Sequence, residues 1–211
     1  MRHPFIATTV LAASLLAACA NPTRSRDLGN PAIAGPVLAQ QACSLCHGTR
    51  GVSTSPNFPN LAAQQPDYLA AQLKGFRSHS RQDPEGFEYM WGIARQLTDD
   101  QIAGIAAYYA AQPPAHQASE GSAAQVGLGR ALFADGAADR GIPACGTCHG
   151  DKGQGMATFP RLAGQHADYI AKQLLVFQRT DQRPEGAAMQ VIAHQLTATD
   201  IVNAAAYLQT L

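Results

Sequence analysis

The sequence contains one five-residue unit twice, about a hundred residues apart, at Cys43–His47 and at Cys145–His149. Both copies read Cys-x-x-Cys-His, which is the attachment signature of c-type haem. The two intervening residues let the chain turn once, so that both thiols can reach one porphyrin while the imidazole comes under its iron. One such unit also occurs in zinc and redox sites, but two matched units indicate haem. We therefore expect two covalently bound haem c groups, with one axial histidine each, attached through Cys43, Cys46 and His47 and through Cys145, Cys148 and His149.

The residues around these units are duplicated as well. Cys43 and Cys145 are 102 residues apart, and the offset falls only to 99 at Tyr108 and Tyr207. A unit of roughly ninety residues can fold but buries little core unaided, and a covalently held porphyrin would supply an apolar centre. The repeat predicts a first domain at residues 32–112 and a second at 123–211. Residues 113–122 form the predicted linker, because its two prolines stop a helix.

The amino terminus has the pattern of an export signal. Within residues 1–20, basic residues precede an apolar run that is short for a membrane span. The last residues, Leu16-Ala-Ala-Cys19, match a bacterial lipobox, which predicts lipidation of Cys19 and a membrane anchor. The alternative is cleavage after Ala20, which discards this fifth cysteine. Either outcome places the mature chain in the periplasm, an oxidising compartment, with residues 21–31 as a polar tether.

Hydrophobic spacing predicts three helices in each domain and an all-α fold. We expect an opening helix, a central helix and a closing helix at 32–41, 66–77 and from Thr98, and again at 121–134, 166–178 and from Thr197. Each threonine is a candidate N-cap, with Gln101 or Asp200 three residues further on. Gly35 and Gly129 occupy equivalent positions in the opening helices, where a glycine would let the closing helix cross closely.

The sixth position on each iron decides the function. An open position binds small molecules or peroxide, whereas a closed one limits the iron to moving electrons. Met90 lies 43 residues after His47, and Met189 lies 40 residues after His149. A methionine is ordinarily core filler, but the pattern Met-x-x-x-Ala-x-Gln-Leu-Thr recurs around both, which favours a ligand. We expect Met156 in a loop.

Other residues are weighed against these ligands. His79, His166 and His194 are rival ligands, but none has a histidine at the equivalent position of the other copy, so we expect them at the surface. A ligating imidazole normally donates its second N–H to a carbonyl. The carbonyls of Pro59 and Pro160 are the candidate acceptors.

The segments 142–155, 160–166 and 189–197 resemble the diheme cytochrome c4 family, and the resemblance covers nearly everything after the tether. It implies two tandem class I cytochrome c domains related by a pseudo-twofold axis. It also implies that Met90 and Met189 are the axial sulfurs and that the two prolines are the acceptors. The implied activity is electron transfer without catalysis, from a quinol-oxidising complex or dehydrogenase to a terminal oxidase.

Several alternatives stay open. The cytochrome subunit of a dehydrogenase, such as a sulfide-oxidising flavocytochrome, would look similar in sequence. A diheme peroxidase or thiosulfate dehydrogenase would need an exchangeable or unusual ligand on one iron, which the paired methionines disfavour. Zinc binding by the four cysteines is a further alternative. Nucleic acid is not an expected partner, because 15 basic residues balance 15 acidic ones.

Overall fold

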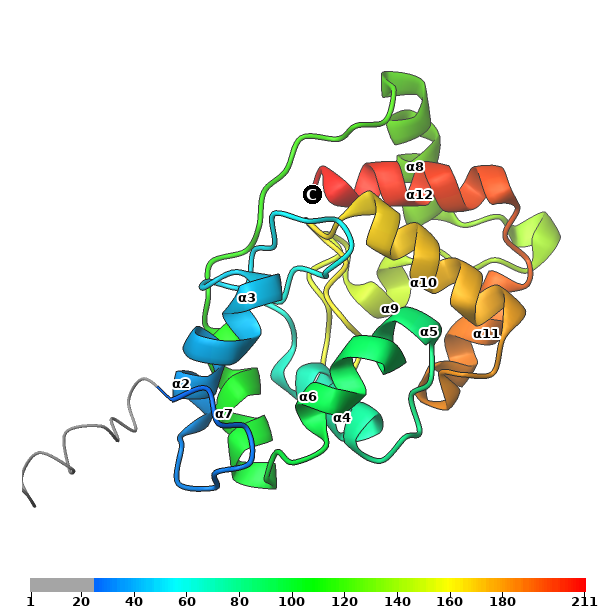
Figure 1. Ribbon diagram of the computed structural model, residues 1–211. Helices are drawn as coiled ribbons and strands as arrows, with labels where there is room; N and C mark the ends of the chain where they lie inside the picture. The colour runs from blue at the N-terminus through cyan, green and yellow to red at the C-terminus, as the bar shows by residue number, and fades with distance from the viewer. Residues whose placement is uncertain (1–24) are drawn as a thin grey trace, which may run out of the picture.

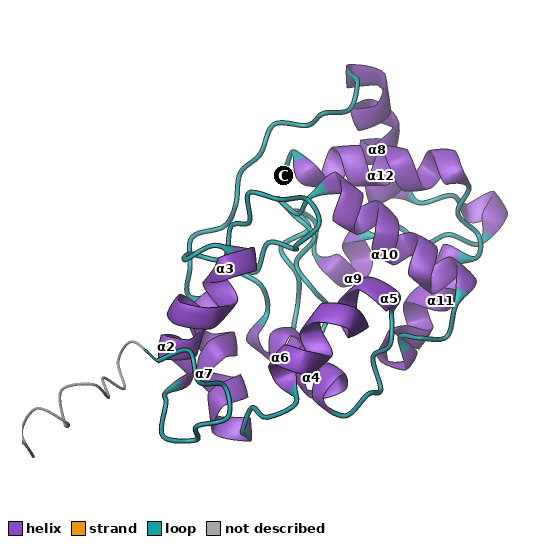
Figure 2. Ribbon diagram, in the orientation of Figure 1, coloured by secondary structure: helices purple, strands orange, loops and turns teal. Residues whose placement is uncertain are grey.

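The computed structural model describes residues 25–211 and forms two helical lobes packed side by side, the first drawn blue to green and the second yellow-green to red (Figure 1). Over this range the helices are joined by loops, and the only β-type pairings are two isolated bridges (Figure 2). The all-α prediction is therefore confirmed. The expected signal, the lipobox and Cys19 lie outside the described residues. None of the described helices has the length and apolarity needed to cross a bilayer.

The first lobe begins with a continuous helical run through its cysteine–histidine unit. Its elements are α2 (Gly35–Leu38), η3 (Ala39–Cys43), α3 (Ser44–His47), α4 (Pro66–Arg77), α5 (Pro84–Gly86), η4 (Phe87–Trp91), α6 (Gly92–Ala94) and α7 (Asp99–Ala110). The π-helical turn η3 ends at Cys43, and such turns are frequent at functional sites. Leu28, which lies within the expected tether at 21–31, packs against this lobe's core.

The second lobe repeats this order. Its elements are α8 (Ala123–Asp135), η5 (Ala138–Arg140), α9 (Gly146–His149), α10 (Ala167–Arg179), η6 (Pro184–Gly186), α11 (Ala187–Ala193) and α12 (Ala198–Gln209). The three helices expected per domain are present in both lobes within a few residues. The short helices around Met90 and Met189 are additional, because segments this short show no clear period.

The closing helices α7 and α12 begin as the sequence predicts. Thr98 accepts a hydrogen bond from the Gln101 backbone N–H while the Gln101 side chain accepts one from the Thr98 N–H. Thr197 and Asp200 form the same capping box at α12. Each box satisfies two backbone donors that would otherwise lack partners, and a cap of this kind contributes about 1 kcal/mol.

The two predicted close crossings are also confirmed. α2 packs against α7, and α8 packs against α12. A methyl group at Gly35 would lie 2.5 Å from the Gln101 carbonyl oxygen, and one at Gly129 would overlap the carbonyl of Asn203. Only glycine therefore permits these contacts, which bring the opening and closing helices of each lobe together.

Gly129→Ala is expected to destabilise the protein by about 1–3 kcal/mol, because the added methyl must push α12 away. Gly127 lies two residues earlier on the same helix, and a methyl there meets nothing within 4 Å. Gly127→Ala is the matched control and is expected to stabilise by about 0.5–1 kcal/mol through helix propensity. Denaturant unfolding of the haem-loaded protein measures both. Equal effects at the two positions would contradict the close crossing.

Candidate haem sites

Each cysteine–histidine unit forms one helical turn that stops directly after the histidine. The turn ends at Gly48 in the first lobe, with φ 76°, and at Gly150 in the second, with φ 80°. A side chain is strained at such angles, and a Cβ at Gly48 would also overlap the Val52 carbonyl. The reversal carries the chain from each histidine toward the loop that contains the following proline.

The four thiols of the two units are all free rather than joined in disulfides. Cys43 packs against the core of the first lobe, and Cys145 packs against a core cluster of the second. Burial raises the pKa of Cys43 to about 11 and also raises the pKa of Cys145. Both thiols lie among apolar side chains, next to which the apolar edge of a porphyrin could pack.

The two histidines have matching surroundings. His47 is 7% exposed with its Nδ1 2.9 Å from the Pro59 carbonyl oxygen, and His149 is 5% exposed with its Nδ1 2.9 Å from the Pro160 oxygen. Because a carbonyl only accepts, Nδ1 must carry the proton, which leaves Nε2 with a lone pair. Burial lowers the pKa of both rings, although the carbonyl contacts oppose this effect. Neutral imidazoles with a free Nε2 suit an iron ligand.

The two methionines are half-buried in corresponding helical segments. Met90 lies on η4 and packs against the same core cluster as Cys43. Met189 lies on α11, which packs against α10. Met156 is 52% exposed in the loop after His149, as expected.

One expectation about the rival histidines is wrong. His79 and His194 are exposed, but His166 is only 6% exposed. Its Nε2 lies 3.2 Å from the Ser53 carbonyl oxygen in the other lobe. The contact joins residues 113 positions apart, so a pattern confined to one repeat carries no sign of it. His166 is part of the lobe interface.

A second buried interface group was also missed by sequence reasoning. Arg81 and Arg183 lie between the lobes, each over a phenylalanine ring of its own lobe. Arg81 pairs with Asp83 at 2.6 Å, and Arg183 pairs with the partly exposed Glu185 at 2.9 Å. The side-chain oxygens of Gln72 and Gln173 each accept from both arginines. These reciprocal contacts follow the pseudo-twofold relation of the two lobes.

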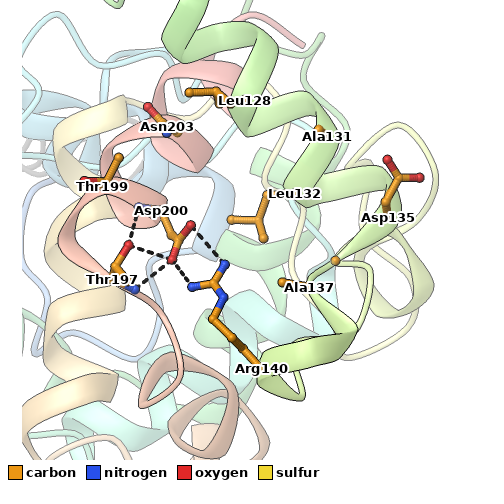
Figure 3. Close-up of a pocket in the computed structure, with 11 residues that line it drawn as sticks. Leu128, Ala131, Leu132, Asp135, Ala137, Arg140, Thr197, Thr199, Asp200 and Asn203 are labelled. Atoms are coloured by element: carbon orange, nitrogen blue, oxygen red, sulfur yellow. Dashed lines mark hydrogen bonds and ion pairs between the residues drawn. The ribbon is translucent and has the colours of Figure 1, made fainter.

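A groove of about 620 Å³ lies on the second lobe, lined by residues of α8, η5 and the start of α12 (Figure 3). In it Arg140 bridges to Asp200 at 2.5 Å, and Thr197 also bonds that carboxylate. The Arg140 hydrogen bond lowers the pKa of Asp200 to about 2. The pair ties η5 to the start of α12 and so has a structural role. Between residues 25 and 211 no three His, Cys, Asp or Glu side chains are grouped to hold a metal ion.

Comparison with known proteins assigns the family. The family model for cytochrome c matches residues 32–111 and again 126–211. Cytochrome c4 of Pseudomonas aeruginosa is 40% identical over 186 residues, covering 84% of this chain and 90% of that protein. The chain belongs to the cytochrome c4 family.

Structures of the cytochrome c4 family agree with this assignment. The crystal structure of reduced recombinant cytochrome c4 from Pseudomonas stutzeri matches with a TM-score of 0.76 and 35% identity, covering 84% of this chain and 96% of that one. A protein named thiosulfate dehydrogenase electron acceptor, from Stutzerimonas stutzeri, is 36% identical over 80% of this chain and 78% of its own length. As a member of this family, the chain has two tandem cytochrome c domains that carry two covalently bound haem c groups. It is an electron-transfer protein and not an enzyme.

Proposed function

We propose that each iron is held between a histidine and a methionine. The ligands are His47 and Met90 in the first domain, and His149 and Met189 in the second. Cys43, Cys46, Cys145 and Cys148 are the attachment points, and the carbonyls of Pro59 and Pro160 orient the histidines. The observation that carries the proposal is the matched pair of buried imidazoles, each with Nδ1 bound to a carbonyl and Nε2 free. The domains are assigned to residues 32–112 and 123–211, joined by the linker 113–122.

If protein side chains occupy both axial positions of each iron, the protein is limited to passing single electrons. A thioether ligand favours reduced iron and raises the potential, which suits a carrier at the oxidising end of a respiratory chain. We assign the protein to the periplasm, held to the membrane through lipidated Cys19. There it takes electrons from a quinol-oxidising complex or a dehydrogenase and delivers them to a terminal oxidase.

Stopped-flow mixing with a purified haem–copper terminal oxidase under oxygen tests this delivery. Fully reduced protein is expected to be oxidised at a rate that saturates with oxidase concentration and falls with added salt, because short-lived docking of carriers depends on local charges. Oxidation no faster than in buffer alone would contradict an oxidase as acceptor.

A second candidate donor is thiosulfate dehydrogenase. It is favoured by the relative that is named as the electron acceptor of that enzyme. Oxidised protein mixed with thiosulfate dehydrogenase and thiosulfate would then be reduced within the turnover time of the enzyme. The flavocytochrome alternative instead requires a stable complex with a flavoprotein, which co-purification would reveal.

A further inference from the structure

Two buried glutamines reach across the lobe interface and bind backbone on the far side. The Gln165 side chain accepts from the Asn60 backbone N–H at 2.8 Å and donates to the Asn60 carbonyl at 2.9 Å. Gln64 makes the same pair of bonds with Arg161, at 2.6 Å to the N–H and 2.9 Å to the carbonyl. Each glutamine thus forms hydrogen bonds with both the backbone N–H and the backbone carbonyl of one residue in the opposite lobe.

The orientation of each side-chain amide is fixed by its surroundings. The Gln165 side-chain oxygen also accepts from the His166 backbone N–H at 3.0 Å, and the Gln64 oxygen also accepts from the Gln65 N–H at 3.0 Å. A flipped amide would bring its NH₂ group against two N–H donors. Both oxygens therefore point at the N–H groups, which makes each glutamine an acceptor toward the far lobe.

Asn60 and Arg161, the residues bound by the two glutamines, directly follow the prolines that contact the histidines. The peptide group between Pro59 and Asn60 accepts from His47 Nδ1 at its oxygen and donates to Gln165 at its N–H. The peptide between Pro160 and Arg161 in the same way joins His149 to Gln64. Two hydrogen-bond chains therefore run between the lobes in opposite directions, each from a histidine of one lobe to a glutamine of the other.

Hydrogen bonds in series polarise one another. An acceptor at the peptide N–H makes the carbonyl oxygen more negative, so the carbonyl draws more strongly on the Nδ1 proton. The imidazole then becomes a more basic ligand. A more basic ligand stabilises oxidised iron relative to reduced iron, and so lowers the reduction potential of the haem that the histidine serves.

We propose that Gln64 and Gln165 are positioning residues. Each raises the basicity of the axial histidine in the opposite lobe by accepting a hydrogen bond from the peptide that joins the proline to the next residue. Each lobe thereby sets part of the reduction potential of the other lobe's haem. This inference rests on the proposal that His47 and His149 are axial ligands.

The test is a redox titration of haem-loaded variants, with each transition assigned to its haem by the hyperfine-shifted NMR signals of the ligands and their domain neighbours. Gln165→Met removes the acceptor and is expected to raise the potential of the first-lobe haem while the second stays near its native value. Gln64→Met is expected to do the reverse. We expect a shift of roughly threefold to tenfold in the one-electron equilibrium constant, a tenfold shift being about 59 mV.

Two further variants separate tuning from a general effect on the interface. Gln65→Met removes a bond between the Gln65 side chain and the Gln154 carbonyl that also crosses the lobes but touches neither peptide, and no selective shift is expected. Gln165→Glu keeps an acceptor for the Asn60 N–H whether its carboxyl is ionised or neutral, so the potential of the first-lobe haem is expected not to rise as it does with methionine. A role in interface packing alone would not separate these two variants in this way.

The inference is overturned if Gln165→Met shifts its own lobe's haem, shifts both haems equally, or shifts neither. Native protein serves as the reference for the ligand proposal. If its NMR spectrum lacks histidine and methionine ligand signals on either haem, the ligand proposal itself fails. If those signals are present but neither glutamine variant changes the reduction potential of the haem in the opposite lobe, only the inference about the glutamines fails.

Discussion

Replacing Met189 with alanine is expected to remove half of the weak far-red methionine-to-iron absorption of the oxidised protein. That band requires sulfur on ferric iron, and the proposed ligation places one thioether on each haem. The potential of the second-domain haem is also expected to fall, because loss of the thioether removes its preference for reduced iron. Optical spectra normalised to two haems per chain measure the band, and a redox titration measures the potential.

Met156 provides the matched control for this prediction. It is also a methionine of the second lobe, but it lies exposed in a loop only seven residues after His149. Met156→Ala is expected to leave both the far-red band and the potentials unchanged. A full native band in Met189→Ala, or loss of the band in Met156→Ala, would remove Met189 as the ligand.

Replacing Asp83 with alanine is expected to destabilise the protein by about 3–5 kcal/mol, the usual cost of removing one partner from a buried ion pair. Asp83 is 1% exposed and accepts from Arg81 at 2.6 Å and 3.2 Å. Without it, the buried Arg81 loses its carboxylate partner, while Arg183 keeps the partly exposed Glu185. Asp99, which pairs with Arg77 at the surface, is the control, and its replacement by alanine is expected to change stability little.

The Asp83 effect is expected to depend on pH. Burial alone would raise the pKa of Asp83, but the hydrogen bonds and charge of Arg81 and the charge of Arg183 outweigh burial and lower that pKa. A group with a lowered folded pKa stabilises the fold above its unfolded pKa, about 3.9, and this stabilisation is lost as the pH falls through the folded value. Denaturant unfolding should show the full difference between native protein and Asp83→Ala near pH 7. A difference that grows toward acid would contradict this assignment.

Features that lie within one repeat could be predicted from the sequence. The capping threonines and the central helix at 66–77 depend on residues close in the chain or on a clear helical period, and the structure forms all of them. The crossing glycines could be found because they occupy equivalent positions in the two opening helices, and both lie against the closing helix. The prolines chosen as histidine acceptors come from a known chemical requirement, and their carbonyls lie at hydrogen-bond distance from the two rings.

Features between the repeats could not be predicted in this way. The partners of His166 and Gln165 lie more than a hundred residues away, and nothing in a single repeat reveals which polar side chains face the other lobe. The alignment of the two repeats also concealed the correspondence between Arg81 and Arg183. The shared Pro-Glu-Gly motif pairs residue 83 with residue 183, whereas in space Arg81 is the counterpart of Arg183.

Carbon monoxide titration of the reduced native protein tests most directly whether both irons are closed. Two haems that each hold a histidine and a methionine leave no position for the gas, so we predict no change in the absorption spectrum at neutral pH. Formation of a carbon monoxide complex on either haem of the native protein would contradict the assignment as a pure electron carrier.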